Sequence, residues 1–318
     1  GIDARSWLGW QMPLKTDEIH GAARIMDIDT ALMRERLASG QVAVVAGFQG
    51  LAPDGRITTL GRGGSDTSAV ALAAALEADR CDIYTDVDGV YTTDPRICPK
   101  AHKLDSVTFE EMLEMASLGA KVLQTRSVAM AMRHNVNLQV RSSFSDAPGT
   151  FVVDEDSIVE QEKISGIAYS PDEAKITIQG LPDQPGIAAG VFGQLADQHV
   201  NVDMIVQSAS TDAKKTDITF SLGRVDMEKA VGIIEKNKEK LGFSGIDSTQ
   251  NVTKISVVGM AMRSQPGVAK TMFETLAEKG INLQVISTSE IKISVLISSE
   301  YTELAVRSLH TAFGLDED

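Results

Sequence analysis

Three polar motifs in the first half of the chain carry residues that can hold anions. The most distinctive is TTLGRGGSDTSAVALAAAL, at 58–76, in which glycines and a serine precede a helix-like run. Glycines let the backbone approach a ligand, and a helix start favours a phosphate or a carboxylate. The guanidinium of Arg62 can donate two parallel hydrogen bonds to an anion, and the carboxylate of Asp66 can hold an ammonium group. The alternative is a tight turn in which Ser65 or Asp66 caps the helix. The motif is not a Walker A loop, because the GK[ST] ending is absent.

The second motif, TDVDGVYTTDPR at 85–96, follows a strand-like run. Thr85 and Asp86 would lie at the carboxyl end of a strand, where open α/β sheets bind ligands. Tyr91 can stack on a base, and Arg96 can meet phosphates. An ordinary polar turn is an equally good reading of the motif taken alone, because Asp-Gly and Asp-Pro are common turn residues.

The third motif, LGAKVLQTRS at 118–127, places Lys121 after a Gly-Ala pair. A lysine there can neutralise charge on a transferring phosphoryl group. A solvated surface lysine is the more common case when the context is ignored. The two cysteines, Cys81 and Cys98, show no pairing signal with a histidine or a cationic pocket, so we expect both to be inert.

The elements around these motifs alternate between strand and helix. Apolar runs predict strands at 41–46, 81–85 and 136–140, and helical spacing predicts helices at 65–78, 109–117 and 125–134. Such alternation is typical of an α/β layer fold. A polar stretch at 142–163, with proline, glycine and then a run of charge, predicts a domain boundary.

The second half contains an internal repeat. Residues 173–210 echo residues 251–290, and QPG recurs at 184–186 and 265–267. Each copy reads as strand, QPG turn, helix and strand, and a further strand and helix follow at 217–222 and 227–238 and again at 292–297 and 301–313. The pattern predicts a βαββαβ-like unit used twice. Copies that face each other across a pseudo-twofold create paired pockets, which favours a regulatory role over simple stacking.

Composition limits the possible partners. The 318 residues suggest two or three domains, and 30 basic against 44 acidic residues give a net charge of −14. Nucleic acid and anionic membranes would repel such a chain. Its two cysteines indicate a reducing compartment, and its five scattered histidines have no metal-ligand spacing. The longest apolar run, Ala69 to Leu76, is far short of a membrane span.

GRGGSD, TDVDGVYTTDPR and GAKVL, in this order and followed by two QPG repeats, resemble the aspartate kinase family over nearly the whole chain. The resemblance implies ATP-dependent phosphorylation of the L-aspartate β-carboxylate to 4-phospho-L-aspartate, the first step towards lysine, threonine and methionine. It implies a cytoplasmic enzyme with an amino-acid-kinase (carbamate-kinase-like) α/β/α sandwich followed by two ferredoxin-like ACT domains. The domains implied are a kinase part at 1–148, a linker at 149–163, a first ACT domain at 164–248, with 164–170 donated to the second, and a second at 249–318.

The resemblance also assigns roles in the kinase part. Arg62 would pair with the α-carboxylate of aspartate and Asp66 with its α-ammonium, in a loop completed by Gly63, Gly64 and Ser65. The ATP site would be lined by Thr85, Asp86, Tyr91, Arg96 and Lys121. Lys121 and a Mg²⁺ ion held through the nucleotide, with no metal ligand from the protein, would offset the charge of the transferring group.

In the ACT domains, the loop before each QPG and the strand after each helix would bind lysine, threonine or both as inhibitors. The first repeat would use Asp183, Pro185, Gly186, Asn201, Asp203 and Gln207. The second would use Ser264, Pro266, Gly267, Asn282 and Val285. Asp183 or Asp203 can face a cationic group, which suits lysine. Pairing of ACT sheets implies a homodimer or a larger assembly, with a separate regulatory subunit as a further possibility.

The chain departs from the family pattern at its start. The strand and K-[FY]-G-G-T-S loop that open family members, and a later Gly-Glu, are absent, so we expect residue 1 to lie inside the kinase domain and the chain alone to be inactive if that segment is required. Two alternatives stay open. One is a non-catalytic, amino-acid-binding regulatory chain of an aspartate kinase, and the other is a kinase of the same fold with another substrate.

Overall fold

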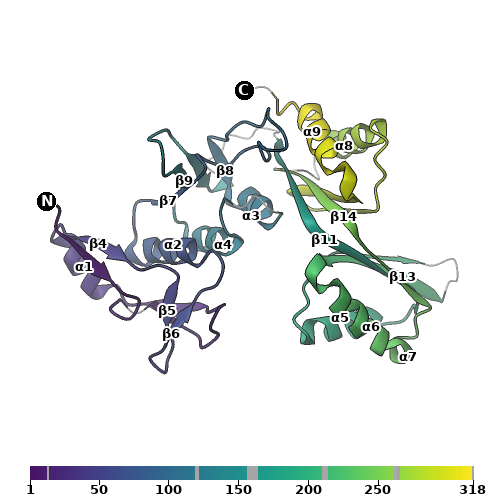
Figure 1. Cartoon of the computed structure of the whole chain (residues 1–318), viewed down its shortest axis with the longest axis horizontal. Helices are drawn as coiled ribbons and strands as arrows, with labels where there is room; N and C mark the ends of the chain where they lie inside the picture. Colours follow the sequence, from purple (N-terminus) through teal and green to yellow (C-terminus); the bar gives the residue numbers. More distant parts are fainter. Residues whose placement is uncertain are drawn as a thin grey trace. The chain divides into compact units, whose positions relative to one another are not determined.

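The computed structural model describes residues 1–12, 14–118, 122–155, 164–209, 214–260, 262 and 266–316. The chain forms two compact units (Figure 1). Unit 1 comprises Gly1–Thr92 and His102–Ser165, and unit 2 comprises Thr93–Ala101 and Gly166–Asp318. The predicted domain bounds stay a prediction, but the short segment Thr93–Ala101 makes its contacts in unit 2, whereas the sequence pattern put it in the kinase part.

Unit 1 alternates strands and helices. Its strands are β1 (Ala4–Trp7), β2 (Leu14–Thr16), β3 (Ile25–Ile28), β4 (Val42–Val45), β5 (Gln49–Leu51), β6 (Ile57–Thr59), β7 (Cys81–Thr85), β8 (Ser106–Thr108), β9 (Leu138–Ser142) and β10 (Thr150–Val153). Its helices are α1 (Ala31–Ala38), α2 (Gly64–Leu76), α3 (Phe109–Ser117) and α4 (Thr125–His134). The strands and helices predicted in this half are confirmed, with ends that differ by no more than two residues.

The main sheet of unit 1 has the strand order β7-β9-β10-β8. β7 and β9 run parallel, and β10 runs antiparallel to β9. Parallel neighbours need a long crossover, which here contains α3 and α4. α2 packs against β7 and α4, so helices bury one side of strands whose inward residues, such as Leu138 and Val140, are fully covered. A second sheet, β3-β2-β5-β6, and a parallel pair, β1-β4, complete the unit.

Unit 2 consists of the two repeats and the segment Thr93–Ala101. Its strands are β11 (Ile164–Pro182, whose first two residues belong to unit 1), β12 (Val202–Ala209), β13 (Lys215–Gly223), β14 (Gly245–Gly259), β15 (Val285–Thr288) and β16 (Lys292–Ser298). Its helices are α5 (Ile187–Asp197), α6 (Met227–Lys236), α7 (Lys238–Leu241), α8 (Pro266–Glu278) and α9 (Thr302–Ala312), with 3₁₀ turns at Arg224–Asp226 and Ser299–Tyr301. The second strand and helix predicted in each repeat are confirmed.

One six-stranded sheet runs through both repeats in the order β12-β13-β11-β14-β16-β15. Its two central strands are long, 19 residues in β11 and 15 in β14. β11 pairs with β13 through its second half, and β14 pairs with β16 through its second half. The donation of 164–170 to the second repeat stays a prediction, which the place of β11 beside β14 favours.

The two repeats share a hydroxyl pair at the same place in the sheet. Thr177 lies opposite Thr219 with their Oγ atoms 2.9 Å apart, and Ser256 lies opposite Ser294 with their Oγ atoms 2.6 Å apart. Because each pair joins the first and last strands of its own repeat at equivalent register positions, the internal repeat is confirmed in structure.

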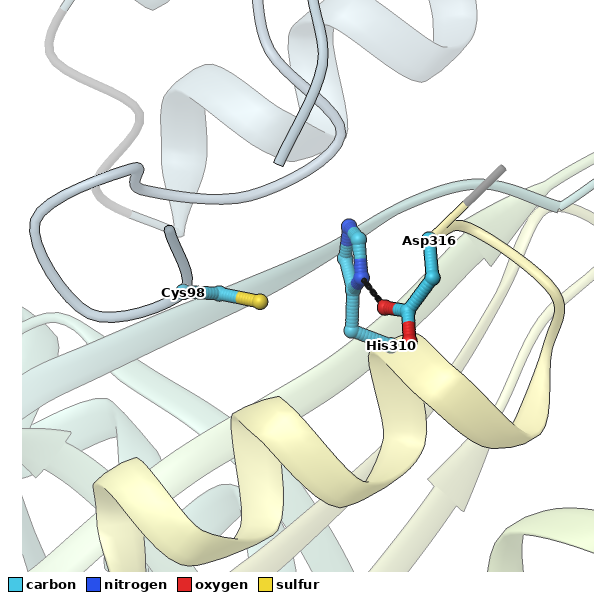
Figure 2. A group of neighbouring side chains, drawn as sticks. All are labelled: Cys98, His310 and Asp316. Atoms are coloured by element: carbon cyan, nitrogen blue, oxygen red, sulfur yellow. Dashed lines mark hydrogen bonds and ion pairs between the residues drawn. The ribbon is translucent and has the colours of Figure 1, made fainter. Parts of the chain in front are cut away.

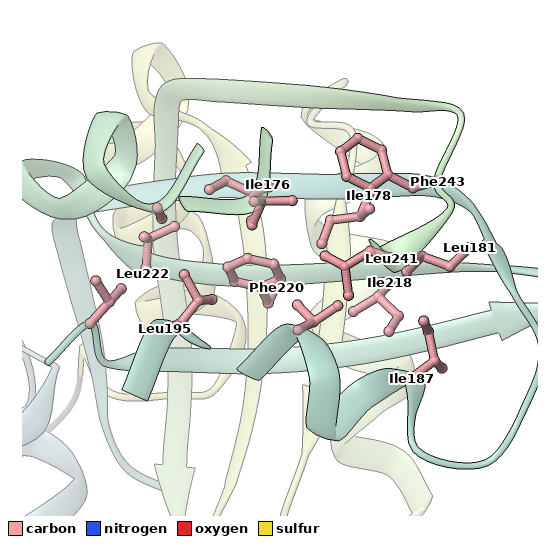
Figure 3. Packing of buried hydrophobic residues seen from close by; sticks show 14 of the residues in the cluster. Ile176, Ile178, Leu181, Ile187, Leu195, Ile218, Phe220, Leu222, Leu241 and Phe243 are labelled. Carbon is pink, nitrogen blue, oxygen red and sulfur yellow. The ribbon is translucent and has the colours of Figure 1, made fainter. Parts of the chain in front are cut away.

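Helices α5 and α6 cover the core of the first repeat. The rings of Phe192 and Phe220 meet edge to face at a centroid distance of 5.4 Å. Phe220 is fully buried among aliphatic side chains from β11, β13 and α5 (Figure 3). Each such side chain contributes about 1.5–3 kcal/mol on burial, so this cluster stabilises the repeat without any bound ligand.

Two contacts tie the repeats together across their strands. Met204 on β12 packs with Val285 on β15 and Leu296 on β16. Lys254 on β14 is buried and forms ion pairs with Glu173 at 3.0 Å and with Asp203 of the first repeat at 2.7 Å. Burial alone would lower the pKa of Lys254, but Glu173 and Asp203 together raise it. The ammonium therefore stays charged inside the unit.

Candidate active site

The loop between β6 and α2 requires glycine at two positions. Gly61 and Gly63 have φ values of +82° and +68°, which side chains rarely tolerate. A Cβ atom on Gly61 would collide with the carbonyl oxygen of Gly21, and one on Gly63 with the side chain of Gln124. The loop is therefore a tight backbone turn leading directly into the first turn of α2.

The predicted N-cap at Ser65 or Asp66 is wrong. α2 begins at Gly64, its N-cap is Gly63, and no side chain caps it. The left-handed conformation of Gly63 supplies the turn that a capping side chain would otherwise stabilise. Ser65 and Asp66 therefore lie inside the first helical turn, and their side chains are not used as caps.

Arg62 and Asp66 are the charged groups of this loop. Arg62 is exposed and Asp66 is half-buried. Within the part of the chain that the structure describes, neither side chain has a hydrogen bond or ion pair to another residue. Burial raises the pKa of Asp66. A guanidinium and a carboxylate without partners, separated by a glycine turn, can bind a ligand that carries both charges.

Arg126, which sequence reasoning passed over, holds this loop from α4. Its Nη1 donates to the carbonyl of Leu60 at 3.0 Å and its Nη2 to the carbonyl of Ala23 at 2.6 Å. Burial lowers the pKa of Arg126. The first and third motifs thus meet at Leu60 and Arg126, although nothing in the sequence shows which carbonyls the guanidinium reaches. Lys121 itself lies outside the described residues.

The second motif follows β7. Thr85 ends the strand, and its Oγ1 donates to Oδ1 of Asp86 at 3.1 Å. The carbonyl of Thr85 accepts from the backbone N–H of Ser143 at 2.8 Å, which fixes the strand end. Asp86 is exposed, so its carboxylate points away from the core at the carboxyl end of the strand.

Tyr91 belongs to a polar group that includes two residues the sequence analysis did not single out. Its hydroxyl donates to Oδ1 of Asp88 at 2.9 Å, and Nζ of Lys103 lies 3.5 Å from Oδ2 of the same carboxylate. Burial and Asp88 raise the pKa of Tyr91. Burial would raise the pKa of Asp88, but Tyr91 and Lys103 hold it below its usual range. Asp88 lies within the second motif. Lys103 follows that motif on a separate stretch of chain, and no sequence pattern marks it as part of the site.

Arg96 lies in unit 2, not with Thr85, Asp86 and Tyr91 in unit 1. Its guanidinium forms three hydrogen bonds with Asp94, from Nε at 3.0 and 3.2 Å and from Nη2 at 2.7 Å. The hydroxyl of Tyr169 donates to the same carboxylate at 3.2 Å. Arg96 is therefore held by unit 2 in this structure.

Comparison with known proteins identifies the family. Residues 1–142 match the amino acid kinase family, and residues 176–237 and 255–313 match the ACT domain. An aspartate kinase of Pseudomonas putida is 54% identical over 317 residues, covering 99% of this chain and 77% of the relative. An aspartokinase of Mycolicibacterium smegmatis is 51% identical over 322 residues, covering 100% of this chain and 76% of the relative. The chain belongs to the aspartate kinase family.

Solved structures agree with the sequence relatives. E. coli aspartokinase III in complex with aspartate and ADP superposes with a TM-score of 0.80 at 29% identity, over 98% of this chain and 70% of that one. The same enzyme in complex with lysine and aspartate gives a TM-score of 0.74 over 98% and 69% of the two chains. The predicted α/β amino-acid-kinase fold followed by ACT domains is confirmed, and the aspartate kinase family makes the chain a phosphotransferase that uses ATP.

The effector positions predicted in the first ACT repeat are mostly exposed. Asp183, Pro185 and Gly186 form the loop before α5, where Gly186 is the N-cap with φ +92°. The carboxylate of Asp183 has no partner among the described residues. Asn201, just before β12, and Gln207 on β12 are both exposed. Asp203 differs, because Lys254 and the backbone N–H of Met204 already bind its carboxylate.

The effector positions predicted in the second ACT repeat are less open. Pro266 and Gly267 begin α8, and Asn282 is exposed before β15. Val285 is buried against Met204 and Leu296, so its side chain faces the core and only its backbone groups can serve a ligand. Ser264 lies outside the described residues.

Two further features of the aspartate kinase chain bear on its chemistry. Burial, followed by the charges of Asp82 and Asp66, raises the pKa of Cys81 to about 11, so this thiol stays protonated and is a poor nucleophile. Among the helices that the structure describes, none combines the length and apolar character needed to cross a bilayer.

Proposed function

We propose that Arg62 and Asp66 hold the aspartate substrate while the residues after β7 hold MgATP. One oxygen of the substrate's β-carboxylate attacks the γ-phosphorus of ATP, a new P–O bond forms as the bond to the β-phosphate oxygen breaks, and ADP leaves. No protein base is needed, because the attacking carboxylate is already ionised. The catalytic contribution of the chain is to align the two substrates and to offset charge on the phosphoryl group.

The observation that carries this proposal is the unpartnered Arg62–Asp66 pair at the start of α2. The exposed guanidinium of Arg62 can take the α-carboxylate in a forked contact. Asp66 can take the α-ammonium, and Gly63, Gly64 and Ser65 bring backbone N–H groups to the helix start. The relative from E. coli binds aspartate, which fits a site built for a zwitterion.

The nucleotide side would use Thr85, Asp86 and Tyr91, with Lys121 meeting phosphates. Mg²⁺ keeps several waters and is bound by one or two carboxylates together with substrate phosphates. The exposed Asp86 fits that requirement, because its only hydrogen bond within the described residues is the one from Thr85. Asp86 would therefore hold the ion through its waters, and the ion would supply charge neutralisation.

Formation of aspartyl phosphate, trapped with hydroxylamine, tests the assignment. Asp66→Asn and Arg62→Ala should each raise the KM for aspartate by about tenfold or more and leave the KM for ATP within about twofold, because each loses a charge-assisted contact to aspartate alone. Arg56→Ala is the matched control, since Arg56 is an exposed loop arginine that pairs with Asp54 at 3.5 Å. Equal loss of affinity for both substrates would contradict these roles, and a full-length protein that forms no aspartyl phosphate would contradict the proposed reaction.

Lysine, threonine or both would inhibit the enzyme from the first ACT repeat. The relative from E. coli binds lysine in its T-state. Here the start of α5 offers backbone N–H groups for a carboxylate, and the free carboxylate of Asp183 suits an ammonium group. Isothermal titration should show saturable lysine binding that Asp183→Asn weakens. Binding that survives unchanged in Asp183→Asn would remove Asp183 from the site.

The edge strand β12 favours assembly of the ACT repeats into a homodimer or a larger oligomer, with or without a separate regulatory subunit. Ile205 is 51% exposed and Val206 37% exposed, on a strand that ends the sheet. An exposed apolar edge of this kind is a template for pairing with another chain. Light scattering should show at least a dimer, and Ile205→Lys should shift it towards monomer. A wild-type monomer at all concentrations would exclude this assembly.

A further inference from the structure

The segment Thr93–Ala101 is a loop that leaves unit 1 and returns to it after packing in unit 2. Its two ends meet in a short stem within unit 1. The backbone N–H of Thr92 donates to the carbonyl of His102 at 3.0 Å, and that of Leu104 donates to the carbonyl of Val90 at 2.8 Å. Tyr91 and Lys103 face each other in an antiparallel bridge. The stem is therefore the covalent connection between the loop and the Tyr91 group.

Helix α9 and the turn after it hold the far end of this loop. Nε of Arg307 donates to the carbonyl of Ile97 at 2.6 Å, and Nζ of Lys100 pairs with Oδ2 of Asp316 at 2.8 Å. Cys98 is 3% exposed, with its sulfur pointing towards the fully buried His310 and towards Asp316 (Figure 2). A backbone contact at Ile97 and an ion pair at Lys100 thus hold the loop, and Cys98 between them is buried.

Cys98, His310 and Asp316 bring one possible ligand atom each to within 4.8 Å of one another, as a metal site would. Asp316, however, already accepts hydrogen bonds from Lys100, His310 and Thr311, each at 2.8 Å. Lys100, followed by His310 and Thr311, holds the pKa of Asp316 at about 2. The ammonium group of Lys100 contacts the carboxylate of Asp316 directly and therefore occupies the position that a metal ion would need. The cluster is therefore an anchor for the loop that is complete without an ion.

We propose that Arg307 and Asp316 are positioning residues for the nucleotide. They hold the loop Thr93–Ala101 on the second ACT repeat, and the loop sets the stem that carries Tyr91 and Lys103. Through that stem they fix the hydrogen bond from Tyr91 to Asp88 in unit 1. This inference rests on the proposed nucleotide role of Tyr91, and it gives the ACT repeats a covalent route to that residue.

Steady-state kinetics of Arg307→Met and Asp316→Asn test the inference. Each variant should raise the KM for ATP about fivefold, the loss expected for one hydrogen bond, with the KM for aspartate within about twofold. Arg307→Lys keeps a donor and should restore most of the affinity for ATP. Lys270→Met is the matched control, because Lys270 pairs with Glu274 on the exposed face of α8 at 3.8 Å. A KM for ATP that is unchanged in both variants would overturn the inference.

Two measurements separate this inference from the proposed reaction. Titration with a fluorescent ATP analogue reports nucleotide affinity even if no aspartyl phosphate forms. Wild-type binding without turnover would therefore contradict the proposed reaction and leave this inference standing. Hydrogen exchange needs no ligand, and Arg307→Met should speed exchange of the amides of Thr92 and Leu104 by about fivefold or more relative to Lys270→Met. Unchanged exchange at these stem amides would overturn the inference, whatever the activity. Parallel rises in both KM values with a lowered Tm would reduce Arg307 to a structural role.

Discussion

The two ACT repeats share one fold but carry different side chains at equivalent positions. Asn201 and Asn282 correspond, and two residues later the first repeat has Asp203 where the second has Gln284. Lys254 in the second repeat reaches across to Asp203, whereas its counterpart Lys175 is half exposed. The ion pair between the repeats is therefore one-sided, although the backbones are related by the repeat.

The last helices of the repeats differ in the same way. Both helices contain an Ala-Val pair, at 230–231 and 305–306. When the repeats are aligned on this pair, Gly232 of α6 is equivalent to Arg307 of α9, and Glu235 is equivalent to His310. Among the described residues, α9 thus carries the donor that holds Ile97, and α6 has no side chain at that position. The comparison indicates that the two repeats have different roles. The first repeat exposes ligand-binding groups, and the second holds the loop Thr93–Ala101.

The largest expected effect is on stability, from Lys254→Met. Removing the ammonium of Lys254 costs about 3 kcal/mol, because the buried carboxylate of Glu173 keeps its charge without compensation, whereas the half-exposed Asp203 is solvated. Lys175→Met, at the equivalent position, should change the free energy of unfolding by no more than about 0.5 kcal/mol. Urea unfolding of both variants measures the difference.

The pH of that experiment follows from the raised pKa of Lys254. Because the pKa of Lys254 is raised in the folded state, its ion pairs contribute fully to the free energy of unfolding below the unfolded pKa of 10.5. That contribution is lost as pH rises through the folded pKa. Neutral pH therefore shows the whole effect. Equal destabilisation by Lys254→Met and Lys175→Met would show that the two repeats are joined symmetrically.

The next effect is on lysine binding. Asn201→Ala should weaken lysine binding about tenfold, because the exposed Asn201 is assigned to the same effector site of the first repeat as Asp183. Asn282→Ala, the equivalent change, should leave lysine affinity within about twofold. Titration calorimetry compares the two. A larger loss in Asn282→Ala would place the effector in the second repeat.

Sequence reasoning predicted the repeat and the α/β alternation because both depend on periodic apolar residues and on turns formed by nearby residues. The first QPG turn, at 184–186, and the strand at 81–85 are examples, and the structure has them at the predicted positions. The family resemblance rested on short motifs in a fixed order, which a single chain displays fully. Local pattern and motif order therefore sufficed for fold class and activity.

What sequence reasoning could not supply depends on contacts between distant residues. The N-cap of α2 was assigned to Ser65 or Asp66 because polar side chains usually cap helices, but the left-handed Gly63 makes such a cap unnecessary. The placement of Cys98 beside His310 joins residues that lie far apart in the sequence, and neither has a local signal. Lys254 likewise sits in an apolar strand with nothing to reveal its two carboxylate partners.

A smaller effect would sharpen the comparison at the shared hydroxyl pairs. Ser256 and Ser294 are buried, whereas Thr177 is half-buried opposite Thr219. Ser256→Ala leaves a buried hydroxyl without its partner and should cost about 1–2 kcal/mol, while Thr177→Ser should cost less than about 1 kcal/mol because the hydroxyl remains. Thermal unfolding monitored by circular dichroism measures both. A smaller loss in Ser256→Ala than in Thr177→Ser would show that the pair does not stabilise the second repeat.

The smallest effect concerns the anchor that is particular to the second repeat, and it depends on pH. Asp316 has a folded pKa of about 2, below its ordinary 3.8, because Lys100 and then His310 and Thr311 favour the carboxylate. Because the pKa of Asp316 is lowered in the folded state, its carboxylate stabilises the fold fully above the unfolded pKa. That stabilisation is lost as pH falls through the folded pKa. Asp316→Asn should therefore lower the free energy of unfolding by about 1 kcal/mol or less at neutral pH, since Lys100 is largely exposed. Urea unfolding should show this difference unchanged down to about pH 5 and shrinking between about pH 4 and pH 2. A difference that shrinks already near pH 6 would contradict the lowered pKa of Asp316.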